Sequence, residues 1–170
     1  MSYRSSIVKS VQRGTINLAG LTSATATITS VVTANAVVRH LGYTNTDATA
    51  EARYFFARLA LTNATTVTAT IGIATGAGVV SFEVVEYYPR VILSIQRGTI
   101  TLAAVTSNTA TISAVSARAT CDFLGNSTTS ANGANTGVTY INLTNTTTVT
   151  AHQAVGSDTV IASYQVTDWY

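Results

Sequence analysis

A long stretch of this chain occurs twice. Residues 7–31, IVKSVQRGTINLAGLTSATATITSV, align without a gap with residues 91–115, VILSIQRGTITLAAVTSNTATISAV, and about 15 of the 25 positions are identical. Three more pairs of segments follow in the same order: LG at 41–42 and 124–125, LTNATTVTA from 61 and LTNTTTVTA from 143, and SFEVVEYY from 81 and SYQVTDWY from 163. Because a whole unit of about 84 residues is copied, we interpret the repeated heptapeptide SVQRGTI/SIQRGTI as structural.

The composition of each unit favours strands over helices. Thr makes up about a fifth of the chain, charged residues only 9%, and branched or aromatic side chains fit a pleated sheet well. Residues 24–31, ATATITSV, alternate with a period of two, as strands do. We predict an all-β fold of two tandem antiparallel β-sandwich domains, Ig-like or jelly-roll-like, from an internal duplication. The predicted boundaries are 1–88 and 89–170, with Pro89 as the hinge.

The period-two pattern also predicts a core and a role for the repeated glycines. Gly14 and Gly98 are expected at positive-φ or bulged positions. Residues 53–61 are predicted to form an aromatic strand. The predicted core comprises Ile16, Leu18, Ile28, Phe55, Leu59, Leu61, Val67, Ile71, Phe82 and Val84 in the first unit, and Ile100, Leu102, Ile112, Ile141, Leu143, Val149, Tyr164 and Val166 in the second.

Charge and hydropathy limit the partners that we expect. The net charge is +2, Lys9 is the only lysine, and no basic run interleaves with aromatics, so we expect no nucleic-acid binding. No apolar run reaches the roughly 18–20 residues that cross a bilayer, and the N-terminus shows no signal-peptide pattern. We therefore expect no membrane association and synthesis in a cytoplasm.

Residues typical of catalysis are few and scattered. His40 and His152 stand alone, and Asp122 next to Cys121 would face the opposite side of a strand. Cys121 aligns with Val37, which favours a small buried apolar side chain over a nucleophile. The segment 72–78, GIATGAG, lacks the following Lys and helix of a phosphate loop, so it is predicted to be a hairpin loop. We predict no catalytic, cofactor-binding or metal site.

One loop of the second unit leaves alternatives open, and sequons occur in both units. The Asn/Ser/Gly-rich loop 125–137 is either a sugar-binding loop or a solvated or inter-subunit contact. Asn-x-Ser/Thr sequons begin at Asn63, Asn126, Asn142 and Asn145, and turn chemistry in a Thr-rich chain accounts for them.

Each unit also keeps one Arg near its start and one acid near its end. We predict two structural ion pairs, Arg13 with Glu86 and Arg97 with Asp168, tying the first strand of each unit to its last. The alternative is that all four side chains face water, where isolated pairs contribute little.

The segments SIQRGTI, TSATATITSV, LTNATTVTA and VSFEVVEYY together resemble small β-rich proteins from the structural-gene regions of tailed bacteriophages. The resemblance covers almost the whole chain, twice, and brings no catalytic residues with it. It implies a non-enzymatic virion protein made in the host cytoplasm. The first expectation is a head decoration protein on the major capsid protein; the alternatives are a tail, collar or fibre subunit, or a carbohydrate- or cell-binding adhesin module.

Further copies of the chain are also expected as partners, because units of about 80 residues are small for an independent core. The second unit carries Gln165 and Thr167 where the first has Glu83 and Val85, so the two units need not make the same contacts.

Overall fold

The computed structural model describes residues 6–46, 49–74 and 78–170. Within these ranges the regular structure consists of antiparallel strands and three short 3-10 helices, which confirms the all-β prediction. No helix of the described part is long and apolar enough to cross a membrane.

The elements of the first half are β1 (Val8–Asn17), β2 (Ser23–Thr27), η1 (Thr33–Asn35), β3 (Ala36–Asn45), η2 (Ala52–Tyr54), β4 (Ala57–Asn63), β5 (Thr66–Ile71) and β6 (Gly78–Tyr87). Those of the second half are β7 (Ile92–Ala103), β8 (Ser107–Thr111), β9 (Thr120–Thr128), η3 (Ala134–Gly137), β10 (Thr139–Asn145), β11 (Thr148–Gln153) and β12 (Thr159–Trp169). The predicted aromatic strand at 53–61 is wrong at its start, because residues 52–54 form η2 and the strand begins only at Ala57.

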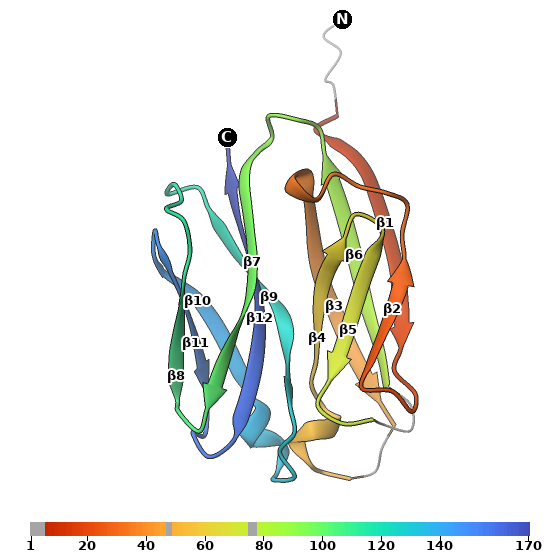
Figure 1. The fold of residues 1–170 in the computed structure, drawn as a ribbon, viewed down its shortest axis with the longest axis vertical. Helices are drawn as coiled ribbons and strands as arrows, with labels where there is room; N and C mark the ends of the chain where they lie inside the picture. The colour runs from red at the N-terminus through yellow and green to blue at the C-terminus, as the bar shows by residue number, and fades with distance from the viewer. Residues whose placement is uncertain (1–5, 47–48, 75–77) are drawn as a thin grey trace, which may run out of the picture.

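The strand pairing of the first half recurs in the second. β6 lies between β1 and β3, and β12 lies between β7 and β9. Likewise β5 lies between β2 and β4, and β11 between β8 and β10. The halves are joined where Arg58 of β4 pairs with Gly125 of β9, which produces a six-stranded sheet across the molecule (Figure 1).

Each half encloses a hydrophobic core that agrees closely with the predicted residues. Within the predicted set, Leu18, Leu59, Val67, Leu102, Val149 and Val166 are fully buried. Phe55 is the clear error: it follows η2 outside any strand and is 39% exposed. Ile141 and Leu143 of β10 are only partly buried. The core of the first half also contains Leu124, which comes from β9 of the second half.

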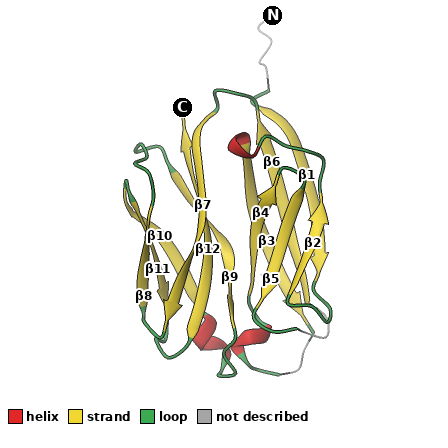
Figure 2. Ribbon diagram, viewed as in Figure 1, coloured by secondary structure: helices red, strands yellow, loops and turns green. Residues whose placement is uncertain are grey.

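A third apolar cluster lies between the halves. It contains the buried residues Val37, Val85, Tyr87 and Ile92, and Trp169 packs against it. The Tyr87 and Trp169 rings meet edge to face with centroids 5.4 Å apart. At the other end of the molecule η2 and η3 lie side by side (Figure 2). The two halves therefore contact each other at both ends.

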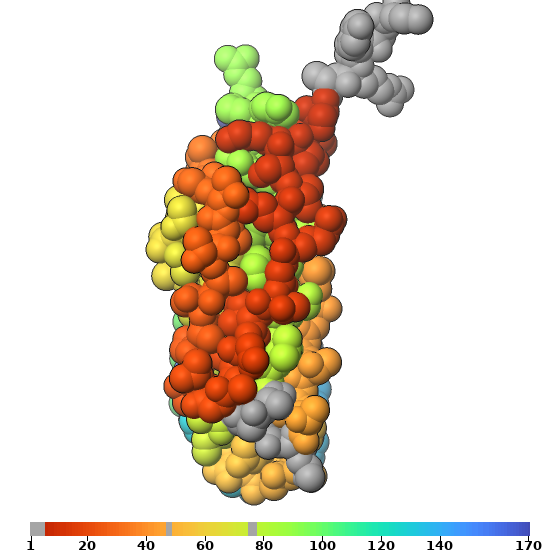
Figure 3. All heavy atoms as spheres, turned by 90° about the vertical axis from the view of Figure 1, so that its right-hand side faces the viewer, coloured from red at the N-terminus to blue at the C-terminus, as the bar shows by residue number. Residues whose placement is uncertain are grey.

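The side of the first half that faces away from the second is built mainly from β1, β2 and the residues around them (Figure 3, red). The burial pattern of β2 alternates between exposed and half-buried residues. This pattern fits an outer strand with one face toward the core and one toward solvent.

Candidate functional sites

The glutamine of each heptapeptide fastens a loop to the first strand of its half. Gln12 donates from Nε2 to the Thr29 carbonyl (2.9 Å) and accepts from the Thr29 N–H at Oε1 (2.6 Å). Gln96 makes the same two bonds with Ser113, at 2.9 and 2.6 Å. A side-chain amide can donate and accept at once, which explains why both copies carry glutamine here.

The predicted ion pairs are wrong in both halves. Arg13 pairs with Glu83 (2.6 Å), and Glu86 pairs with Lys9 (2.9 Å). The register is the reason: Arg13 lies opposite Glu83, three residues from Glu86, which is about 10 Å along the strand and on the opposite face.

In the second half Arg97 likewise lies opposite Gln165 rather than Asp168, and its Nε donates to the Gln165 Oε1 at 2.9 Å. Burial lowers the pKa of the Arg97 guanidinium to about 10, so it remains charged at neutral pH.

Glu86 and Asp168 instead bind the same two loops that the glutamines fasten, each in its own half and a few residues further along the loop. Glu86 accepts from the Val32 N–H (3.0 Å), and Asp168 accepts from the Ser116 N–H (3.0 Å) and hydroxyl (2.5 Å). Burial alone would raise the pKa of Glu86, but the Val32 and Lys9 hydrogen bonds outweigh it and hold the pKa below its ordinary value. The Ser116 hydroxyl and N–H lower the pKa of Asp168.

The glycines make room for aromatic rings. Gly14 lies opposite Phe82, and a Cβ on Gly14 would come within 2.8 Å of that ring. Gly98 lies opposite Tyr164, and a Cβ there would come within 2.6 Å of the Tyr164 hydroxyl. The prediction of positive φ or a bulge is wrong, because neither glycine has positive φ and the register shifts lie elsewhere. Gln, Arg and Gly of the heptapeptide thus all serve the fold.

Gln165 is the polar centre of the contact between the halves. It is fully buried, its Oε1 accepts from the Val38 N–H (3.2 Å) and its Nε2 faces the Val38 carbonyl (3.4 Å). Arg97 donates to the carbonyls of Thr33 and Ala36 beside it. The free edge of β3 is therefore capped by side chains of the second half, as edge strands commonly require.

The substitution of Glu83 by Gln165 between the halves follows from this contact. A carboxylate accepts but cannot donate, whereas the amide can do both toward Val38. In the first half Glu83 lies between Arg13 and Arg39, at 2.6 and 3.1 Å, and needs no donor. The sequence indicated different contacts at this position but not which surface would be covered.

The candidate reactive residues have structural surroundings. Cys121 lies opposite Val166 as Val38 lies opposite Val84, so its counterpart is Val38 and not the predicted Val37. Burial, with a smaller effect of Asp122, raises the pKa of the Cys121 thiol to about 11, which keeps it protonated and poorly nucleophilic. Among the described residues, no three His, Cys, Asp or Glu side chains lie together as a metal site would require.

Each histidine has a local partner. His40 Nε2 lies 3.1 Å from the Ala57 carbonyl, and Nδ1 accepts from the Gly42 N–H, an arrangement that suits the neutral ring. Burial lowers the pKa of His40, and the backbone hydrogen bonds oppose this only in part. The His152 ring stacks on Tyr140 with centroids 4.7 Å apart.

The predicted loop 125–137 is wrong at both ends, because it begins inside β9 and ends in η3; the segment between them packs against the first half. The N–H groups of Ala52 and Arg53 donate to the carbonyls of Asn132 (2.8 Å) and Ser130 (3.0 Å). Asn126 is 3% exposed and donates to the Gly137 carbonyl, so its amide nitrogen faces the protein. The side chains of Asn63 and Asn145 accept from N–H groups two residues on, the turn chemistry expected for these sequons. Residues 75–77 of the predicted hairpin loop lie outside the described part.

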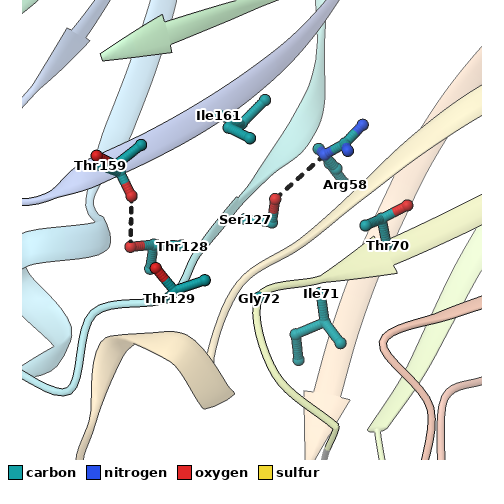
Figure 4. Close-up of a pocket in the computed structure, with 9 residues that line it drawn as sticks. All are labelled: Arg58, Thr70, Ile71, Gly72, Ser127, Thr128, Thr129, Thr159 and Ile161. Carbon is teal, nitrogen blue, oxygen red and sulfur yellow. Dashed lines mark hydrogen bonds between the residues drawn. The ribbon is translucent and has the colours of Figure 1, made fainter. Parts of the chain in front are cut away.

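One pocket of about 180 Å³ lies between the halves, beside the junction of β4 and β9 (Figure 4). Its lining comprises Arg58, Thr70, Ile71, Gly72, Ser127, Thr128, Thr129, Thr159 and Ile161. Arg58 Nε donates to the Ser127 hydroxyl (3.1 Å), and no carboxylate of the described residues lies within ion-pair distance of its guanidinium. Burial lowers the pKa of Arg58. A guanidinium beside threonine and serine hydroxyls offers hydrogen bonds to a small anionic or hydroxylated molecule.

Sequence reasoning missed Arg58. The only available signal was its position in the repeat, where the second unit has Tyr140.

Comparisons with protein-family models, with curated proteins and with solved structures gave no match.

Proposed function

We propose that this protein is a non-enzymatic structural subunit of a tailed-bacteriophage virion, and specifically a head decoration protein that binds the major capsid protein. The observation that carries the structural part is that the repeated polar residues are used by the fold itself. Gln12, Glu86, Gln96 and Asp168 all bond to backbone groups of their own half. A chain selected for chemistry would be expected to keep some of these groups for a substrate.

We further infer that the halves are two sandwich domains that arose by tandem duplication. The shared order of strand pairing and the equivalent bonds of Gln12 and Gln96 support this inference. The phage context rests on the sequence resemblance. Other virion proteins and further copies of the chain are the proposed partners, and the virion is the proposed location.

The test is to quantify the protein in purified particles. A decoration protein should co-purify with intact particles at a copy number close to that of the major capsid protein, and particle maps should show it on the capsid surface. A few copies per particle would favour the tail, collar or fibre alternative. Absence from particles of a phage that encodes and expresses the chain would refute the virion role.

A carbohydrate- or cell-binding module is the second candidate, and the Arg58 pocket is the observation in its favour. The pocket offers a guanidinium and several hydroxyls, which suit an acidic or hydroxyl-rich ligand. The test is to titrate the purified protein with acidic and neutral monosaccharides while following its NMR spectrum. Shifts centred on Arg58 and Ser127 that vanish in Arg58→Gln would support this candidate, and unchanged spectra would remove it.

A further inference from the structure

The contact between the halves contains an apolar plug. Leu124 of β9 is 1% exposed and belongs to the core of the first half. Gly125 follows it with φ +86°, pairs with Arg58 of β4, and leaves no room for a Cβ against Ala57 and the His40 ring. Leu124 and Gly125 of the second half thus fill the β3–β4 side of the first.

The plug has an unused counterpart in the first half. Leu41 and Gly42 occupy the positions of Leu124 and Gly125, since both pairs lie at the register shift of β3 or β9. Leu41 is 52% exposed, whereas Leu124 is 1% exposed. Gly42 has φ +139° and nothing lies within 4 Å of where its Cβ would be.

The receiving surface also has an unused counterpart, in the second half. Phe123 occupies the position of His40, because Phe123 lies opposite Tyr164 as His40 lies opposite Phe82. Tyr140 occupies the position of Arg58 in the repeat. Phe123 is 38% and Tyr140 61% exposed. In the described part of the chain β10 pairs only with β11, whereas its counterpart β4 pairs with both β5 and β9.

The core beneath this surface is correspondingly less covered. Leu59 and Leu61 of β4 are 0% and 8% exposed, but Ile141 and Leu143 of β10 remain partly exposed. A plug against β10 would bury apolar surface in the second half just as Leu124 does in the first.

We propose that Leu41 and Gly42 of one copy dock against Phe123 and Tyr140 of a second copy, repeating between chains the contact that Leu124 and Gly125 make within one. The plug and the receiving surface belong to different halves, so the contact is head-to-tail. Such contacts close into rings or continue as filaments, depending on the rotation between copies. The contact would cover the exposed surface of Leu41, Phe123 and Tyr140, whose ring already stacks on His152.

The proposal deepens the proposed structural role, on which it rests, by naming the surface through which copies assemble. Glu83 stands in the first half where Gln165 stands in the second. Its carboxylate cannot donate a hydrogen bond to the strand edge of the second copy, so the contact between chains is weaker than the contact within the chain. Assembly should therefore depend on protein concentration, and a supporting lattice would strengthen it through multivalency.

The experiment measures the mass of the purified full chain by sedimentation velocity over a series of concentrations. The wild type should form species larger than a dimer as concentration rises. Leu41→Asp and Phe123→Asp should each remain monomeric, because each destroys one of the two surfaces. Leu93→Asp is the matched control: Leu93 is 51% exposed on β7, and this variant should assemble like the wild type.

Mixing the two defective variants gives the decisive result. Each retains the surface that the other lacks, so an equimolar mixture should form a one-to-one heterodimer and nothing larger. A wild type that stays monomeric up to its solubility limit would overturn the proposal, as would defective variants that assemble normally or a mixture that stays monomeric. These measurements use the protein alone, so a negative result leaves the particle-composition test of the virion role intact.

Discussion

The Phe82 ring covers Gly14 across the β1–β6 pair, and Tyr164 covers Gly98 in the same way across β7 and β12. A glycine in a strand is unfavourable by itself, but here its missing side chain admits an aromatic ring. The glycine of the repeated heptapeptide is therefore fixed by its cross-strand neighbour.

Gly14→Ala and Gly98→Ala should each lower the free energy of unfolding by about 1–3 kcal/mol, because the new methyl group would overlap the ring. Chemical denaturation measures the effect. Gly133→Ala is the control: the nearest atom to its Cβ would be the Asn135 side-chain oxygen at 3.2 Å, so the change should be close to neutral. A combined Gly14→Ala/Phe82→Leu variant more stable than the sum of its single changes would identify the ring as the cause, and strict additivity would exclude it.

Gln165 and Glu83 provide a matched pair at equivalent positions. Gln165→Glu should cost about 1–3 kcal/mol, because the buried Val38 carbonyl would lose its amide donor and a carboxylate would face Asp122, and the new ion pair with Arg97 would offset these losses only in part. Glu83→Gln removes ion pairs whose arginines are 67% and 50% exposed, and should cost less than about 1 kcal/mol. Equal costs in denaturant titrations would contradict the assignment of Gln165 to the contact between the halves.

Leu124→Ala should destabilise the protein by about 2–5 kcal/mol, because it leaves a cavity in the core of the first half. Leu41→Ala, at the equivalent but exposed position, should leave the free energy of unfolding of the monomer within about 0.5 kcal/mol of wild type. Thermal unfolding at low protein concentration compares the two. A large effect of Leu41→Ala under those conditions would place Leu41 in the fold of the monomer and not at a free surface.

Asp168 should make stability depend on pH in the acid range. Its pKa is lowered by the Ser116 hydroxyl and N–H, so the folded protein binds fewer protons than the unfolded chain. The stabilisation is complete above the unfolded pKa of about 4 and is lost as the pH falls through the lower folded value. Asp168→Asn should be less stable at neutral pH and should flatten the acid limb of a plot of unfolding free energy against pH. An unchanged acid limb would show that Asp168 does not carry this dependence.

The strands and most of the core could be predicted from the sequence, because alternation in segments such as 24–31 reports the face that each residue occupies. The ion pairs could not, because they depend on register: Arg13 and Glu86 both have counterparts in the second unit, yet each binds a different partner across β1 and β6. Glu86 and Asp168 recur at equivalent positions of the two units, but their N–H partners at Val32 and Ser116 lie in loops whose path the pattern does not encode.

The contact between the halves was beyond sequence reasoning for a related reason. Gln165, Leu124 and Arg58 all contact residues of the opposite half, and no local pattern reveals which outer surface another unit will cover. The repeat provided an indirect sign, since the residue type differs at the position where Glu83 pairs with Arg13 and Arg39 of its own half and Gln165 contacts Val38 of the other half. The residue that faces the other half is Gln165.

The placement of Leu124 also has a consequence for the order of folding. The first half emerges from the ribosome before β9 does, so it lacks at first the side chain of Leu124, a residue some forty positions beyond its last strand, in its core. We expect the folded first half to be only marginally stable on the nascent chain and to gain stability when β9 packs against it. In the finished protein, loss of β9 would again remove Leu124 from that core, so the two halves should melt together in one cooperative transition.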